Sequence, residues 1–268
     1  MIARMALRTS EWIIVAYFAY LAGAAAVLPN IGQQQRRQAI GMAMAALIAI
    51  LALAALDTRA IVLRDWMPLV YIVVGYRLPA LLVTGMNEAF ERRLLTFDRR
   101  CQVTAISARA PDSVIELLEL AYLCCYPMIP IGFAILYFTD LPGEAERFLI
   151  AVLLSAFGCY GVLPWLPTRP PRAIEDAPVR SAGPVRRFNL RVLGLASVQL
   201  NTFPSGHVAA SLATAMAVSA GLPFVGFLLL LLAIAITLGS VVGRYHYAAD
   251  ALAGTALAIV GFLISRAV

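Results

Sequence analysis

The sequence predicts an all-α membrane protein, a polytopic helix bundle, and two observations support this prediction. The first is composition, because 62% of the 268 residues are hydrophobic and 13% are charged. A typical soluble domain is about 45–50% apolar and about 25% charged. The second is that the apolar residues gather in runs of 17 or more, each long enough to cross a bilayer as a helix. A soluble fold could not bury several such runs.

Eight apolar segments are predicted to span the membrane, at residues 12–28, 40–56, 66–84, 114–138, 148–166, 208–221, 224–242 and 249–265. The first run follows Arg4 and Arg8 and also resembles a signal peptide, but its length favours a retained span. Arg77 and Pro79 interrupt the third run, where a kinked or partly re-entrant segment is expected. Arg77 fits equally a functional ionisable group and a side chain that snorkels to the interface.

The spans predict a division into two parts. Residues 1–60 are expected to form an N-terminal extension of about two spans, and residues 61–268 a six-span core. Between spans, residues 87–110 mix arginines with leucines and phenylalanines, a pattern that suits a helix lying in the headgroup layer. Residues 168–203 form the longest polar stretch, and long connections of this kind are usually functional or disordered.

All 21 basic residues are arginine, and the net charge is +6. Arginine suits phosphate because its planar fork binds two oxygens at once, although high genomic GC content explains the bias as well. No nucleic-acid-binding module is visible, so nucleic acid is not an expected partner. The spacing of the four cysteines fits neither a zinc site nor a disulfide framework. No metal and no cofactor are expected.

Three short segments lie at the ends of apolar spans, at residues 168–172, 203–207 and 243–250. They contain the only two histidines, His207 and His246, which are 39 residues apart. Because a span of about 20 residues covers the ~30 Å hydrocarbon core, this separation fits one crossing and one return. Both histidines are therefore expected on one membrane face, with Arg169 on the same face because the loop after it crosses no membrane.

Each residue type in these segments suits phosphoryl transfer. Asp250 lies four residues after His246, on the same side of a helical turn, where a carboxylate can fix the imidazole tautomer and leave the other nitrogen free to attack. His207 is then the expected acid for the departing oxygen. The opposing interpretation is structural, since histidines at span ends are commonly only interfacial and aspartate commonly caps helices.

The expected phosphate-binding groups surround these side chains. Ser205 and Gly206 precede a helix, where free N–H groups and the macrodipole favour an anion. Arg169, Arg172 and Arg244 can neutralise the oxygens of the transferring phosphoryl group, and with these charges no metal is needed.

At these residues the chain resembles the type 2 phosphatidic acid phosphatase superfamily of integral membrane lipid phosphatases and phosphotransferases. That family has the motifs Lys-x6-Arg-Pro, Pro-Ser-Gly-His and Ser-Arg-x5-His-x3-Asp. Residues 204–207 match the second motif in full, and His246-x3-Asp250 matches the end of the third. The resemblance covers roughly residues 66–268. It implies a metal-independent phosphohistidine mechanism with His246 as nucleophile, Asp250 as its orienting partner and His207 as general acid.

Two departures from the family pattern concern the basic residues. Val162 stands where the lysine of the first motif belongs, and Arg172 is a candidate replacement. In the third motif only one residue separates Arg244 from His246, which is similar to the inositol phosphorylceramide synthase branch. Members of that branch move a phosphorylated headgroup onto a lipid alcohol instead of water.

The first functional hypothesis is a lipid phosphatase that acts on a lipid phosphate in the bilayer. The second keeps the phosphohistidine but transfers a phosphorylated headgroup, such as phosphoinositol, to a lipid or polyol hydroxyl. The third is a phosphate-lipid-binding membrane protein without turnover.

A multi-pass location in the plasma (inner) membrane is expected. The resemblance favours an active site on the outer or periplasmic face, which the count of spans also gives for an inside N-terminus. The distribution of arginine opposes this, with 14 on the active face and six on the other, since basic loops are usually cytoplasmic. The outer face is slightly favoured, because some of these arginines are expected to bind phosphate.

Overall fold

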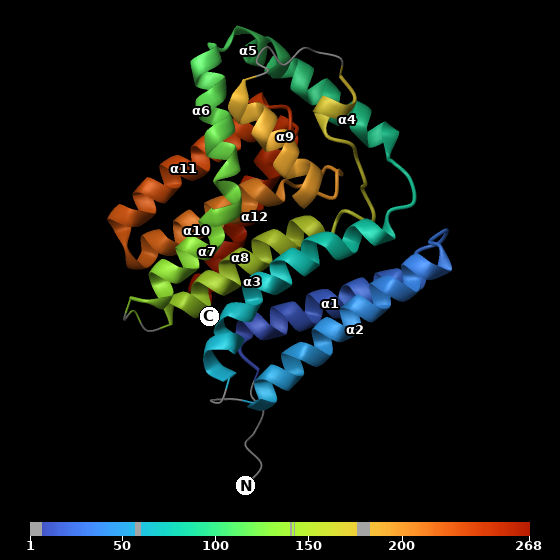
Figure 1. The fold of residues 1–268 in the computed structure, drawn as a ribbon, viewed down its shortest axis with the longest axis vertical. Helices are drawn as coiled ribbons and strands as arrows, with labels where there is room; N and C mark the ends of the chain where they lie inside the picture. The colour runs from blue at the N-terminus through green and yellow to red at the C-terminus, as the bar shows by residue number, and fades with distance from the viewer. Residues whose placement is uncertain (1–6, 57–59, 140, 142, 176–182) are drawn as a thin grey trace. The chain divides into compact units, whose positions relative to one another are not determined.

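The computed structural model describes residues 7–56, 60–139, 141, 143–175 and 183–268. Within these ranges the chain is helical and has no strand; the one extended pairing is an isolated bridge between Thr168 and Asn201. The fold is thus the predicted all-α polytopic bundle. The chain divides into two compact units, unit 1 at Met1–Thr84 and unit 2 at Gly85–Val268 (Figure 1).

Unit 1 contains three helices and a short 3₁₀ segment, which are α1 (Thr9–Val27), α2 (Gln33–Leu56), α3 (Ile61–Arg77) and η2 (Leu78–Leu82). A buried ion pair joins α1 to α3, since Arg64 donates to both carboxylate oxygens of Glu11 at 2.6 and 2.7 Å. Exposed Arg77 ends α3. The third predicted span therefore lies with the first two in unit 1. The predicted boundary at residues 60 and 61 stays a prediction.

Unit 2 holds the three motif segments. Its helices are α4 (Glu88–Arg100), α5 (Val103–Arg109), α6 (Asp112–Leu123), α7 (Cys125–Tyr137), α8 (Glu144–Tyr160), α9 (Pro184–Ala196), α10 (Gly206–Gly221), α11 (Pro223–Val242) and α12 (Ala248–Ala267), with a 3₁₀ turn η3 at Pro171–Ala173. Helix α10 is central and packs against α7, α8, α11 and α12. Helices α4, α5 and α9 lie at one end of this bundle (Figure 1).

Four described helices, α1, α2, α11 and α12, are long and apolar enough to cross a membrane. The pair α6 and α7 makes a fifth candidate that is bent by 51° at Cys124. Pro127 explains the bend, because its ring clashes with the carbonyl of Leu123 four residues earlier and it cannot donate to that carbonyl. The predicted spans at 66–84, 148–166 and 208–221 fall on α3, α8 and α10, which have 17, 17 and 16 residues. The protein is multi-pass, and the count of eight stays a prediction.

Gly254 allows α12 to approach the beginning of α10. The Ser205 N–H donates to the Asp250 carbonyl at 3.0 Å, and a Cβ at Gly254 would lie 2.7 Å from the Ser205 oxygen. Gly254→Ala is therefore expected to lower the free energy of unfolding by about 1–3 kcal/mol, because backbone must move. Thermal unfolding in detergent measures this. Gly194→Ala on α9, where a Cβ meets nothing within 4 Å, is the matched control, and an equal loss in both variants would contradict the explanation.

Candidate active site

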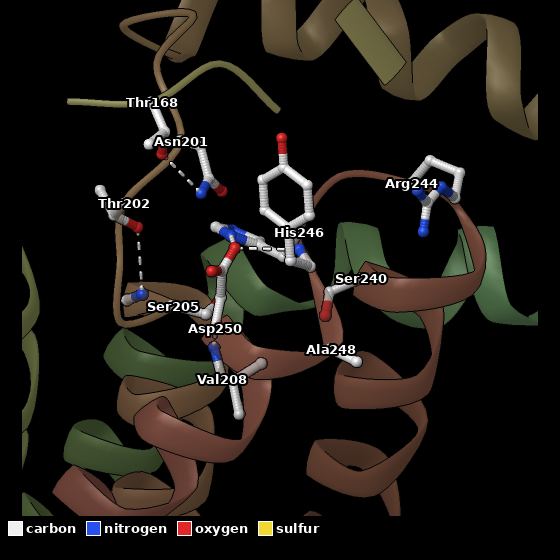
Figure 2. A network of polar contacts seen from close by, with 12 residues as sticks. Thr168, Asn201, Thr202, Ser205, Val208, Ser240, Arg244, His246, Ala248 and Asp250 are labelled. Carbon is white, nitrogen blue, oxygen red and sulfur yellow. Dashed lines mark hydrogen bonds and ion pairs between the residues drawn. The ribbon is translucent and has the colours of Figure 1, made fainter. Parts of the chain in front are cut away.

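His246 lies in the short loop between α11 and α12. The loop folds back onto α11, since the N–H groups of Tyr245 and His246 both donate to the Ser240 carbonyl at 2.9 Å. One turn later, Asp250 Oδ2 lies 3.4 Å from His246 Nδ1 and accepts the Tyr247 N–H at 2.9 Å (Figure 2). The carboxylate therefore caps α12 and contacts the imidazole at the same time. The capping and orienting interpretations of Asp250 do not exclude each other.

His207 comes to this loop from the second position of α10. The centroids of the His207 and His246 rings are 5.8 Å apart, and the ring planes are inclined by 71°. Ser205 is the N-cap of α10, and its Oγ accepts the Val208 N–H at 3.4 Å. The fold thus brings together the two histidines and the aspartate that the sequence singled out.

Three tyrosines that the sequence interpretation missed lie near the histidines, and two of them contact His207. The rings of Tyr122 and Tyr126 stand edge-on to it, each with centroids 5.6 Å away. Tyr245 stacks on Tyr122 at 4.2 Å with nearly parallel planes. Tyr245 precedes His246 in the sequence, so its proximity to the site was predictable. No sequence signal connects the tyrosines of α6 and α7 to a histidine on α10.

Arg172 brings a positive charge to the histidines. The guanidinium of Arg172 lies 5.2 Å from the Tyr245 ring centroid. The backbone N–H of Arg172 donates to the Arg244 carbonyl at 3.1 Å. Burial, and secondly the charge of Arg172, lower the pKa of His246 to about 3. His246 is therefore neutral at physiological pH, which is the form that can act as a nucleophile.

The other two predicted phosphate-binding arginines contact carboxylates on the inner face of α4. Arg169 donates to Glu91 from Nε at 3.1 Å and from Nη2 at 2.7 Å. Arg244, whose backbone is left-handed with φ of 60°, donates from Nη1 to Asp98 at 2.6 Å and from Nη2 to Glu175. Figure 2 shows Arg244 apart from the His246–Asp250 pair. Both arginines thus connect the motif loops to α4.

The backbone N–H groups of Ser205 and Gly206 also have protein partners. The Ser205 N–H donates to the Asp250 carbonyl, and the Gly206 N–H donates to Thr202 Oγ1 at 3.3 Å (Figure 2). Both residues therefore fix the start of α10 against its neighbours. Their predicted phosphate contact stays a prediction.

A buried carboxylate, Glu119 on α6, connects three side chains close to the histidine loop. It accepts hydrogen bonds from Arg186 at 2.6 Å, from the Asn189 side chain at 2.7 Å and from the Tyr245 hydroxyl at 2.5 Å. Burial and this carboxylate raise the pKa of Tyr245, which stays a neutral donor. Glu119 thereby joins α9 to the loop that carries His246.

The first and second motif segments are joined directly. Asn201 donates from its backbone to the Thr168 carbonyl at 2.8 Å and from its side chain to Thr168 Oγ1 at 3.1 Å (Figure 2). The Tyr247 hydroxyl donates to the Arg169 carbonyl at 3.0 Å, which adds the third segment. Across the described ranges, no three His, Cys, Asp or Glu side chains are grouped as metal ligands would be.

The lowered pKa of His246 predicts a pH dependence of stability. An unfolded histidine titrates near 6.5, so between pH 6.5 and about 3 the unfolded state binds more protons than the folded state. Stability contributed by neutral His246 is complete above pH 6.5 and is lost as the pH falls. From pH 7 to pH 5 this loss is on the order of 2 kcal/mol. Thermal unfolding should therefore depend less on pH in His246→Gln than in the wild type, and equal slopes would contradict the shift.

Comparison with known proteins gives one match. A family model described as the PAP2 superfamily matches residues 88–264, a range that includes all three motif segments and more than half of the chain. No curated protein and no solved structure matches. The match confirms the resemblance that the motifs indicated, at the level of the superfamily and not of a branch. The chain therefore belongs to the PAP2 superfamily, whose members are generally phosphatases or phosphotransferases.

Proposed function

We propose that the protein is an integral membrane lipid phosphatase that works through a phosphohistidine at His246. The observation that carries the proposal is the contact of His246 with Asp250, together with the His207 ring 5.8 Å away. Membership of the superfamily supports the reaction class.

In the first step the free Nε2 of neutral His246 attacks phosphorus, and the phosphorus–oxygen bond to the lipid breaks. Asp250 accepts a hydrogen bond from Nδ1–H and stabilises the positive charge that develops on the ring. His207, protonated once the phosphate dianion of the substrate lies beside it, gives that proton to the departing oxygen, so the lipid leaves as an alcohol. In the second step His207 takes a proton from water, which attacks the phosphohistidine. Inorganic phosphate leaves and both histidines return to their starting forms.

Among the three arginines, Arg172 is proposed to bind the phosphoryl oxygens. It is the arginine whose charge acts on His246, whereas Arg169 and Arg244 are held by Glu91 and Asp98. We assign positioning roles to Arg169 and Arg244. Arg172 then provides the charge that the lysine of the first family motif would supply.

Hydrolysis is tested with purified protein in detergent containing EDTA. Phosphatidate and a polyprenyl phosphate are the substrates, and released inorganic phosphate is measured. The wild type is expected to release phosphate, and His246→Ala is expected not to. Activity that survives this substitution would rule out the mechanism.

Transfer to an alcohol is the second candidate, because a single residue separates Arg244 from His246 in the third motif. The chemistry at His246 is the same, but a lipid or polyol hydroxyl replaces water in the second step. A labelled phospholipid donor with a panel of alcohol acceptors, analysed by mass spectrometry, separates the two. Absence of any transfer product supports hydrolysis. Lipid binding without release or transfer would support the third, non-enzymatic reading.

The proposed location is the inner membrane with the site on the outer face. Single cysteines at Ser181 and Thr139, placed in a variant without the four native cysteines, test this in intact cells. An impermeant maleimide should label the Ser181 position alone. Labelling at the Thr139 position alone would put the site on the cytoplasmic face.

A further inference from the structure

The outward face of α4 carries a stripe of arginines. A shallow groove of about 440 Å³ lies along this face, and its lining residues recur at helical spacing: Ala89, Arg92, Arg93, Thr96, Phe97 and Arg100. The three arginines are exposed. We call this set the arginine stripe. The carboxylate of Glu88 lies 3.8 Å from Arg92. The stripe itself contains three arginines and no acidic residue, so it is cationic.

The opposite face of α4 is used for packing inside unit 2. Leu94 and Leu95 are buried against Tyr247. Glu91 and Asp98 are buried on the same face and hold Arg169 and Arg244. Of the apolar residues that predicted a helix lying in the headgroup layer, Phe90, Leu94 and Leu95 pack inside unit 2, whereas Phe97 lines the groove. The outward face of α4 presents mainly arginines.

A hydrogen bond ties α4 to the start of α12. Asp98 Oδ1 accepts the N–H of Ala248 at 2.9 Å, and Ala248 is the first residue of α12, one of the helices apolar enough to span a bilayer. Helix α4 thus lies at the end of a helix that is long and apolar enough to span the bilayer. The headgroups of the surrounding lipids occupy this level.

We propose that the arginine stripe binds the phosphate-bearing headgroups of anionic phospholipids in the surrounding bilayer. Guanidinium groups match phosphate oxygens in pairs, and basic residues next to a span attract anionic lipid. A bound headgroup would hold α4 at the interface. It would thereby also hold the α4 carboxylates of Glu91 and Asp98, which form ion pairs with Arg169 and Arg244. The site is separate from the histidine site, and its occupancy does not require turnover.

The test is native mass spectrometry of the full chain in detergent with equimolar phosphatidylglycerol and phosphatidylcholine. The wild type is expected to retain phosphatidylglycerol preferentially. Arg93→Gln with Arg100→Gln should reduce this preference roughly five-fold for each arginine removed, because each substitution removes a direct guanidinium–phosphate hydrogen bond in the groove. The matched control is Arg99→Gln with Arg109→Gln, which removes two exposed arginines from α4 and α5 outside the groove.

The control variant should keep the wild-type preference. An undiminished preference in the stripe variant, or an equal loss in the control, would overturn the proposal. Binding of a single-stranded oligonucleotide is measured separately on the same variants. If the stripe variant loses that binding and keeps its lipid preference, the stripe is a nucleic-acid surface and the proposal fails. If the double variant does not fold, Arg100→Gln alone is expected to give the roughly five-fold loss. Lipid retention is measured without substrate, so failure of the histidine mechanism does not affect the result.

Discussion

His246→Gln is expected to lower phosphate release from a lipid phosphate by roughly 10⁴-fold or more, because removing a nucleophile removes the covalent route and not merely one stabilising contact. Glutamine keeps a polar side chain of similar reach in the buried loop, so the fold should survive. The measurement is the single-turnover rate in detergent, with the thermal unfolding midpoint as the control for folding.

The same variant tests which histidine carries the phosphoryl group. Rapid acid-free quenching of wild-type protein with ³²P-labelled substrate should give label on His246, and His246→Gln should give none. His207→Gln should slow both steps by roughly 10²–10⁴-fold, since it removes the general acid and base. Label on His207 in the wild type would exchange the two roles.

The parts of the site that the sequence predicts are those set by short spacing and by topology. His246 and Asp250 are four residues apart at the start of a helix, so the backbone geometry alone puts them on one side. His207 is separated from them by the α10–α11 hairpin, which the two apolar runs and the turn between them predict. Composition likewise suffices for the fold class, because membrane-spanning helices must be apolar throughout.

The partners of the arginines were not predictable in this way. Arg244 and Asp98 are 146 residues apart, and many carboxylates in the chain were equally available to Arg244 on charge alone. Burial and packing of α4 against α12 select Asp98. Similarly, Glu119 meets Arg186 only because α9 packs on α6. A motif states which residue types are present, whereas packing decides which oxygen each guanidinium faces.

Arg172→Gln is expected to reduce kcat by roughly 10²–10³-fold, the usual loss when one preorganised group that stabilises transition-state charge is removed. Arg172 lies over the Tyr245 ring and its charge acts on His246, so its proposed role is at the reacting phosphoryl group. Arg172→Lys should recover part of the rate, because charge returns without the planar fork.

Arg244→Gln is the comparison that separates binding of phosphate from positioning. It leaves Asp98 and Glu175 without their cation in a buried setting, and breaking such a pair is expected to cost about 3 kcal/mol of unfolding free energy. Arg172→Gln should therefore lower kcat with a smaller fall in melting temperature than Arg244→Gln, whose main effect should be on the melting temperature. The opposite result, in which Arg244→Gln loses kcat at unchanged stability and Arg172→Gln unfolds, would contradict this assignment. Arg244 would then bind the phosphoryl group, as the arginine of the third family motif does.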